Sequence, residues 1–494
     1  MTHRERMTPI DTAWLRMDRP SNLMVIVGVM VLATPVSIDR LEKTINKRLV
    51  TQFRRFGQRV VEALGGPYWE DDLEFTLDNH LVKTTLPRGN QVAELLKLTS
   101  SLASEPMDMN RPLWRFHLVE NYLGGSAIIV RIHHCIADGI ALVGVMMSLT
   151  DASADAPEPA IREKRAPRQT ESEHLWSALA NSLRSMPSGT IKLSGALWAK
   201  YIEIAGDPQR LASYRSDGIG YATELAKLLT LPADSPTRFK GGTGLVKRVA
   251  WSETIPVDEI KAVGKPLGCS VNDVLLTAVA GALRRYLLAK GDPVDGVEIR
   301  AMVPVNLRGA SDPHNLGNRF GLVTLSLPVW ESNPFARLFE VRRRMIDLRG
   351  SYLAPLTLGI FSALGLAPKP LYREALALLS AKASAVMTNV PGPKEPLYLT
   401  GAKLSQMMFW VPQAGDIGMG VSILSYANHV QFGLITDAGL VPDPEAITPL
   451  FRSEFDNMLY GLLMGEWNES FDIDELATTL KKQRASVRQV SGTL

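Results

Sequence analysis

The sequence predicts a mixed α/β (α+β) protein built of two related units, each with a mixed sheet. Short β-branched runs, which are typical of buried strands, alternate with segments of helical spacing in both halves. A polar, proline-containing segment at 151–173 separates the halves. With 494 residues, the chain is long enough for two or three domains with sizeable cores. We therefore expect an N-terminal domain at 1–150, a linker and helical connector at 151–244, and a C-terminal domain at 245–494.

The first half begins with a short helix, expected at 11–18, and a continuous β-branched strand at 24–32. Apolar residues then recur at every fourth position with charges between them, which predicts an amphipathic helix over 38–50. The strand expected at 114–120 should pair with the strand that carries the two histidines considered below. The other elements expected in this half are strand-like segments at 68–69 and 81–85 and a helix at 92–104.

The connector contains two kinds of sequence. The segment 151–173 combines prolines with charges and predicts a solvated linker. Residues 175–205 return to apolar helical spacing and carry Trp176 and Trp198. Two interpretations of them stay open: helices packed between the domains, or an interfacial segment that touches a membrane or a lipid droplet. The glycine cluster at 241–244 lacks the spacing of a phosphate-binding loop, so we interpret it as a hinge.

The second half starts with a strand expected at 246–252 and a helix expected at 257–267. Ser270 and Asp273 have the spacing of a capping box, so a long and mostly apolar helix should follow at 274–289. The remaining elements expected are strands at 297–303, 319–327, 406–411, 419–426 and 429–436, a helix within 368–385 and a helix at 446–463.

The composition limits the classes of partner and the compartment. The chain has 54 basic and 51 acidic residues, and a net charge of +3 is too small to indicate nucleic acid as the main partner. Two cysteines, Cys135 and Cys269, cannot form a disulfide framework, which favours a reducing cytoplasm. No signal peptide is visible, and the longest apolar run, Leu23 to Val36, is shorter than a spanning helix requires. We therefore expect a cytoplasmic protein that is soluble or peripheral.

Two adjacent histidines mark the candidate site. Residues 127–132 form a β-branched run and residues 140–149 are apolar all round, so His133 and His134 should lie between a buried strand and a buried helix. Adjacent strand residues point to opposite faces, so only one of the two rings can face a given cavity. We expect one histidine to be presented there and the other to support it. A neutral imidazole is the natural base for a hydroxyl proton near pH 7.

Asp138 and Gly139 complete this segment. Asp138 is expected at or near the N-cap of the following helix, and Gly139 leaves no side chain where a substrate could approach. A purely structural interpretation would make the histidines core residues and the aspartate an ordinary cap. The whole pattern between a buried strand and a buried helix favours function instead. A metal site is the weakest interpretation, because tandem histidines diverge and no third ligand stands nearby at helical spacing.

The spacing of these residues, HHxxxDG, resembles the active-site motif of acyl-CoA-dependent acyltransferases with the chloramphenicol acetyltransferase fold. Other motifs, which run in the expected order from about residue 7 to about residue 465, resemble those of the bacterial wax ester synthase/diacylglycerol acyltransferase family. They are Pro112-Leu113-Trp114, Asn272-Asp273, a Pro-Val-Asn-Leu-Arg run ending at Arg308, Gly317-Asn318, and an Asn-Val-Pro-Gly-Pro run starting at Asn389.

The resemblance implies two chloramphenicol acetyltransferase-like subdomains with an active-site tunnel between them. It also implies acyl-CoA as a co-substrate, no permanently bound cofactor or metal, and a long-chain alcohol or diacylglycerol as acceptor. By the same resemblance, His134 is the general base, His133 supports its loop, and Asp138 pairs with Arg308. Contact with a membrane or lipid inclusions remains an open possibility for a protein with such substrates.

The residues that assist the reaction are less certain from sequence. Asn272 is our candidate for polarising the acyl carbonyl or positioning the acceptor, and the alternative is that Asn272 and Asp273 only cap a helix. Lys240, Lys247 and Arg248 could meet a coenzyme A phosphate or could be scattered surface charges. The residues that contact coenzyme A therefore stay unknown at this stage.

The sequence departs from the family near its start. Many members carry a Met-His-Val-Gly-Gly-like strand, whereas this chain has Met24-Val25-Ile26-Val27-Gly28, a difference that bears on the acceptor preference. Two other functions stay open: a condensation-type or polyketide-associated acyltransferase, and a non-catalytic lipid-binding or lipid-droplet surface protein. The chain has no G-x-S-x-G nucleophile elbow, which counts against a serine hydrolase.

Overall fold

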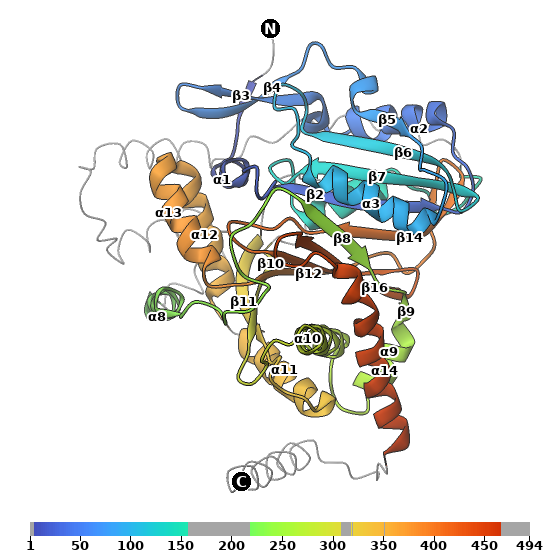
Figure 1. Cartoon of the computed structure of the whole chain (residues 1–494). Coiled ribbons are helices and arrows are strands. Elements are labelled where there is room, and N and C mark those ends of the chain that lie inside the picture. The colour runs from blue at the N-terminus through green and yellow to red at the C-terminus, as the bar shows by residue number, and fades with distance from the viewer. Residues whose placement is uncertain (1–3, 157–217, 308–317, 319, 350, 466–494) are drawn as a thin grey trace, which may run out of the picture.

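The computed structural model describes residues 4–156, 218–307, 318, 320–349 and 351–465. It contains two large mixed sheets, one made mostly by the first half and the other by the second half (Figure 1). A small three-stranded sheet, in the order β1-β4-β3, lies at the N-terminal end; its strands are β1 (Arg4–Arg6), β4 (Gly66–Asp71) and β3 (Gln58–Ala63). The predicted mixed α/β class is confirmed.

The first large sheet has six strands, and its centre is fully buried. All residues of β2 and β7 are buried, as their continuous apolar sequences predict. All neighbours pair antiparallel except β5 and β6, which are parallel. In spatial order the strands are β13 (Tyr398–Leu399), β14 (Ala402–Trp410), β2 (Val25–Leu32), β7 (Gly125–His133), β6 (Trp114–Tyr122) and β5 (Leu81–Thr84).

The second large sheet has seven strands and contains both kinds of pairing. Strand β12 is parallel to β10 and to β15, and the other neighbours are antiparallel. In spatial order the strands are β11 (Phe320–Leu327), β10 (Ile299–Asn306), β12 (Ala385–Pro391), β15 (Met419–Tyr426), β16 (His429–Asp437) and β8 (Lys247–Trp251), and β9 (Ile255–Pro256) also pairs with β16.

One strand pair crosses between the two halves. Strands β13 and β14 come from the second half of the sequence, yet β14 adds to the edge of β2, with Phe409 opposite Gly28 and Trp410 opposite Val27. The three-part division expected from the sequence did not anticipate this crossing. Backbone hydrogen bonds therefore tie the second half to the first, close to the strands that carry the histidines.

Helices cover the sheets. Helix α10 is buried along most of its length, and Figure 1 shows it beneath the second sheet together with α11 and α14. The helices are α1 (Pro9–Met17), α2 (Ile38–Ile45), α3 (Gln91–Ser104), α4 (Gly139–Ser148), α8 (Gly218–Thr230), α9 (Val257–Gly264), α10 (Val271–Ala289), α11 (Pro334–Arg349), α12 (Leu353–Leu366), α13 (Lys369–Ser380) and α14 (Thr448–Met464). Short turns of helix occur at η1 (Asn46–Val50), η2 (Arg54–Gly57), η3 (Leu77–Asn79) and η4 (Pro444–Ala446).

Helix α1 belongs to the first half but packs on α12 of the second half. A Cβ atom on Gly365 would lie 1.7 Å from the carbonyl oxygen of Pro9, so only glycine allows this approach. The Arg16 guanidinium donates to the carbonyl oxygens of Gly365 at 2.9 Å and Ala367 at 2.8 Å. The second half therefore fixes the position of the first helix.

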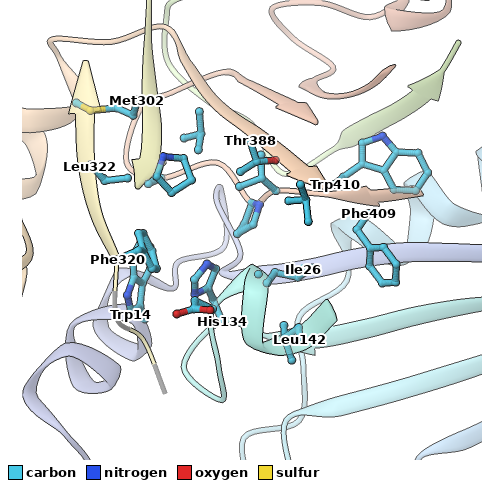
Figure 2. A pocket seen from close by; sticks show the side chains of 18 of the residues that line it. Trp14, Ile26, His134, Leu142, Met302, Phe320, Leu322, Thr388, Phe409 and Trp410 are labelled. Carbon is cyan, nitrogen blue, oxygen red and sulfur yellow. The ribbon is translucent and has the colours of Figure 1, made fainter. Parts of the chain in front are cut away.

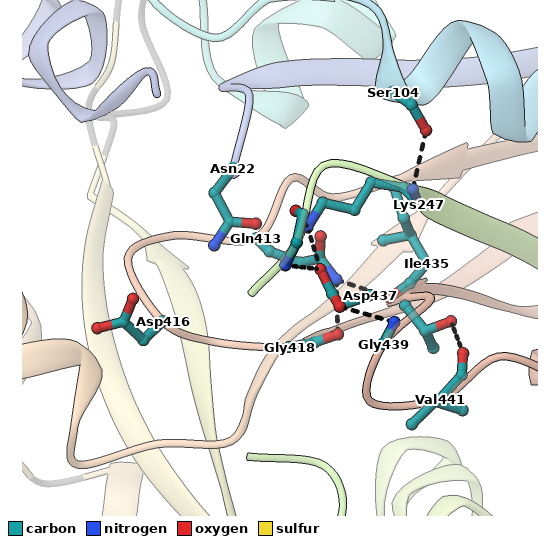
Figure 3. A network of polar contacts seen from close by, with 12 residues as sticks. Asn22, Ser104, Lys247, Gln413, Asp416, Gly418, Ile435, Asp437, Gly439 and Val441 are labelled. Carbon is teal, nitrogen blue, oxygen red and sulfur yellow. Dashed lines mark hydrogen bonds and ion pairs between the residues drawn. The ribbon is translucent and has the colours of Figure 1, made fainter. Parts of the chain in front are cut away.

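A buried ion pair corrects one expectation from the sequence (Figure 3). The Lys247 ammonium lies 2.7 Å from Oδ2 of Asp437, and the two side chains are 4% and 0% exposed. Asp437 also accepts hydrogen bonds from the backbone N–H groups of Gly244 and Gly439. The Lys247 ammonium is therefore buried and paired within the protein, and its interpretation as a contact for a coenzyme A phosphate is wrong. Its backbone N–H donates to Ser104 Oγ of α3, which links the two halves.

Some expectations cannot be compared with the structure. The apolar segment 175–205, with Trp176 and Trp198, and the expected Asp138 partner Arg308 lie outside the described residues. Among the helices that are described, none has both the length and the hydrophobicity needed to cross a membrane.

Replacement of Lys247 tests the importance of the buried pair. We expect Lys247→Ala to lower the free energy of unfolding by about 3 to 5 kcal/mol, because Asp437 would remain buried without its partner. Lys261→Ala is the matched control, since Lys261 forms an exposed pair with Asp258 and should cost less than about 1 kcal/mol. Urea unfolding measures both. Equal effects of the two substitutions would contradict the role given to Lys247.

Candidate active site

The two histidines point in opposite directions at the end of β7. Strand β7 ends at His133, which pairs with Val25 of β2, and the His134 N–H donates to the Met24 carbonyl oxygen at 2.7 Å. Successive side chains of an extended chain alternate between its faces. Accordingly, His134 lines a cavity, and His133 is turned into the protein with 1% of its side chain exposed.

His133 is held by groups on either side of its ring. The Cys135 N–H donates to Nδ1 at 3.1 Å, and Nε2 lies 3.6 Å from Oδ1 of Asp18. The same carboxylate oxygen accepts the Met24 N–H at 2.6 Å. These contacts are compatible with a supporting role for His133, which stays a prediction.

His134 is stacked between aromatic rings. Its imidazole lies on Trp14 with ring centroids 4.4 Å apart and an interplanar angle of 22°, and Phe320 is 5.8 Å away. Nδ1 has no hydrogen-bond partner in the described part of the chain. Burial lowers the pKa of His134 to about 4, although the nearby carboxylate of Asp138 opposes this effect. The imidazole is therefore neutral near pH 7 and can accept a proton.

The cavity beside His134 lies between the two large sheets, where the family resemblance implies a tunnel. Figure 2 shows Trp14 and Phe320 next to His134 at one end, and Phe409 and Trp410 at the other end. Most of its lining is aliphatic or aromatic and includes Ile26, Leu142, Val143, Met302, Leu322, Phe361, Val386 and Leu424. Because both halves contribute, the cavity exists only when they are assembled. Its chemistry suits a long apolar chain that reaches a single basic group.

Asp138 and Gly139 also line the cavity. Asp138 is the N-cap of α4, as the sequence predicts, and its side chain accepts the Ala141 N–H at 2.9 Å. A Cβ atom on Gly139 would meet no atom within 4 Å, so the space beside the backbone is open. Because Arg308 is outside the described residues, its pairing with Asp138 stays a prediction. No three potential metal ligands of the His, Cys, Asp and Glu types come together in the described ranges.

Asn272 lies near the cavity but does not cap its helix. The cap of α10 is a box formed by Ser270 and Asp273, in which Ser270 Oγ accepts the Asp273 N–H and Asp273 Oδ2 accepts the Ser270 N–H. Asn272 is exposed, and its Oδ1 accepts a 2.6 Å hydrogen bond from the side chain of Asn389, which lines the cavity. The structure thus brings two sequence motifs together. A role for Asn272 toward a substrate stays a prediction.

The unusual strand sequence at 24–28 has a simple geometric consequence. Ile26 lines the cavity, and Gly28 lies against the ring of Phe409, where a Cβ atom would be 2.2 Å from the ring. Val25 and Val27 alternate to the other face of β2 and are absent from the lining. The positions that differ most from the family pattern therefore point away from the cavity.

Sequence reasoning missed two residues that contact His134. Trp14 lies within the helix expected at 11–18, and the sequence indicates no separate role for it. Asn318 belonged to a recognised motif but had no assigned role. It donates to the His134 carbonyl oxygen at 3.0 Å. Both contacts depend on packing between segments far apart in the chain, which local patterns do not reveal.

Comparison with known sequences identifies related proteins. Residues 7–275 match the family described as the wax ester synthase/diacylglycerol acyltransferase catalytic domain, and residues 316–459 match the WS/DGAT C-terminal domain. The O-acyltransferase WSD of Acinetobacter baylyi is 25% identical over 465 residues, which cover 88% of this chain and 92% of that protein. A Mycobacterium tuberculosis protein named as a probable diacylglycerol O-acyltransferase is 28% identical over 397 residues, covering 79% of this chain and 81% of the relative.

Solved structures share the fold. A wax ester synthase/diacylglycerol acyltransferase from Marinobacter aquaeolei superposes with a TM-score of 0.64 at 23% identity, covering 93% of this chain and 99% of that chain. The first condensation domain of the calcium-dependent antibiotic synthetase gives a TM-score of 0.57 at 14% identity, with coverages of 96% and 99%. At these identities the structural likeness supports the fold alone.

The burial of His134 can be tested by titration. We expect its imidazole to titrate with a pKa of about 4, and Trp14→Ala should raise this pKa toward the ordinary value of about 6.5 because water would reach the ring. NMR of selectively ¹³C-labelled histidine, assigned with His134→Gln, measures both values. The control is Phe451→Leu, which alters a buried ring stacked on Phe432 in the second core. A wild-type pKa near 6.5 would refute the description of a buried neutral ring.

Proposed function

From the premise that the chain belongs to the wax ester synthase/diacylglycerol acyltransferase family, we propose that it moves a long-chain acyl group from acyl-CoA to a hydroxyl group. The acceptor is a fatty alcohol, diacylglycerol or both, and His134 is the general base. One observation carries the proposal: a neutral, buried imidazole lies on the wall of an apolar cavity between the two sheets.

The reaction is a direct attack within a complex of both substrates. His134 removes the proton of the acceptor hydroxyl, and the hydroxyl oxygen forms a bond to the thioester carbonyl carbon. The tetrahedral intermediate then collapses, the carbon–sulfur bond breaks, and the imidazolium returns its proton to the departing thiolate. The products are an ester and free coenzyme A. Because a thioester is already activated, the enzyme needs no covalent nucleophile of its own.

The apolar lining serves this chemistry in two ways. Long acyl and alkyl chains gain free energy by leaving water for such a cavity, at about 25 cal/mol for each Å² of apolar surface. Exclusion of water also removes the competing nucleophile that would hydrolyse the thioester. The low pKa of His134 follows from the same burial and keeps the ring in the form that accepts a proton.

Three further residues have proposed supporting roles. Asn272 donates through its amide to the acyl carbonyl or positions the acceptor; its Oδ1 is engaged by Asn389, which leaves its own N–H groups to act as donors. Asp138 holds the start of α4, and its pairing with Arg308, which the family resemblance implies, is part of the proposal. His133 fixes the loop through Asp18.

The proposed substrates also indicate where in the cell the protein acts. Acyl-CoA is a co-substrate and not a resident cofactor. Long-chain alcohols and diacylglycerol partition into membranes and lipid inclusions, so we propose a cytoplasmic enzyme that contacts such surfaces peripherally. The apolar cavity supports a lipid acceptor and gives no support to a nucleic acid partner.

Thiol release from palmitoyl-CoA tests the proposal. Wild-type protein should release thiol only when hexadecanol or dipalmitoylglycerol is added, and His134→Ala should lower kcat by about 10² to 10⁴ fold, the usual contribution of a general base. The matched control is His429→Ala, which changes an exposed histidine at the start of β16. If His134→Ala and His429→Ala release thiol at the wild-type rate, the base has been assigned wrongly.

A further inference from the structure

Asn318 connects the two halves of the protein at the backbone of His134. It lies just before β11 in the second half, and only 3% of it is exposed. The residues it contacts, Asp11 of α1 and His134 after β7, both belong to the first half. None of the reaction steps above uses it.

Its amide group is matched to two acceptors. Nδ2 donates to Oδ1 of Asp11 at 2.8 Å and to the backbone carbonyl oxygen of His134 at 3.0 Å. An asparagine amide has two N–H donors, so both are used. The backbone N–H of Asn318 also donates to Oδ1 of Asp11 at 3.3 Å. These three contacts leave the amide a single orientation.

Together with other contacts of His134, these hydrogen bonds fix where its imidazole lies. His134 is fixed at its N–H by the Met24 carbonyl oxygen and at its own carbonyl oxygen by Asn318. Trp14 lies three residues after Asp11, on the same face of α1, and stacks on the imidazole ring. Helix α1 therefore acts on the ring directly through Trp14 and on the backbone through Asn318.

The burial of Asp11 makes a purely structural role for this cluster a poor explanation. Asp11 is 1% exposed, and burial raises its pKa, while Arg55 and Asn318 oppose that effect. The nearest cation to Asp11 in the described part of the chain, Nη1 of Arg55, is 3.7 Å away, which is too far for a hydrogen bond. A buried carboxylate whose charged partner lies this far away contributes little to the stability of the fold. Its best hydrogen bond goes to the amide that also holds His134.

We infer that Asn318 is a positioning residue for His134. Anchored by Asp11, it holds the His134 carbonyl from the second half of the chain, so that the imidazole has its working orientation only when the two halves are docked. The inference rests on the proposed role of His134 as the base. It assigns Asp11 and Asn318 to turnover through their hold on His134.

The isosteric variant Asn318→Asp tests this inference in the full-length protein. It replaces the NH2 group, which carries both donors, by one carboxylate oxygen that faces two acceptors. We expect kcat for palmitoyl-CoA and hexadecanol to fall roughly 10- to 100-fold, with KM for palmitoyl-CoA changed by less than about twofold. Asn318→Ala, which removes the donors without adding repulsion, should lower kcat in the same way and serves if the first variant does not fold.

A reciprocal exchange separates positioning from simple docking of α1. In the double variant Asp11→Asn with Asn318→Asp, the amide at position 11 can donate to the carboxylate at position 318. The His134 carbonyl, however, still faces an acceptor. We expect Tm to return toward the wild-type value while kcat stays low. A double variant with wild-type kcat would overturn the inference, because the His134 contact would then be dispensable.

Two controls keep this test apart from the test of the base. If His134→Ala retains thiol release, the proposed function fails. If His134→Ala is inactive while Asn318→Asp and Asn318→Ala both keep the wild-type kcat, only the positioning role fails. The remote core variant Phe451→Leu shows how far loss of stability alone lowers kcat. A comparable loss of kcat in this variant at the same Tm would also refute the positioning role.

Discussion

The contact on which the site depends is the packing of α1 against α12. This interface joins the first helix of the chain to the second half through a close backbone approach at Gly365 and the hydrogen bonds of Arg16. It places Trp14 on the His134 ring. Without it, the imidazole would lose both its aromatic neighbour and its shield from water. The geometry of the His134 imidazole is therefore a product of docking between the halves.

Burial has one consequence for the Lys247–Asp437 pair and another for His134. Lys247 and Asp437 are buried together and neutralise each other in a network that ties α3 to the second sheet. His134 is buried next to apolar rings, and its pKa falls to about 4, so that it remains an uncharged acceptor. The same exclusion of water that lowers this pKa prepares the cavity for long apolar chains.

The sequence predicted most elements because their patterns are local. The β-branched runs, the helical spacing and the capping residue Asp138 can be recognised from residues nearby in the sequence. The structure places the corresponding elements as expected. Three contacts could not be predicted in this way: the addition of β14 to β2, the burial of Lys247 with Asp437, and the contact of Asn318 with His134. Each joins segments that lie far apart in the chain. Such contacts are decided by tertiary packing, so periodicity could not reveal them. The family resemblance named several of the residues but did not show which ones touch.

The central claim is that a neutral, buried imidazole takes the acceptor proton. The most direct test is the pH dependence of kcat/KM for hexadecanol, because this quantity reports the essential base of the free enzyme. Our account predicts a rate that is constant from pH 8 down to about 5 and an acid limb with a midpoint near the His134 pKa of about 4. An acid limb centred near the ordinary histidine pKa of about 6.5 would contradict it.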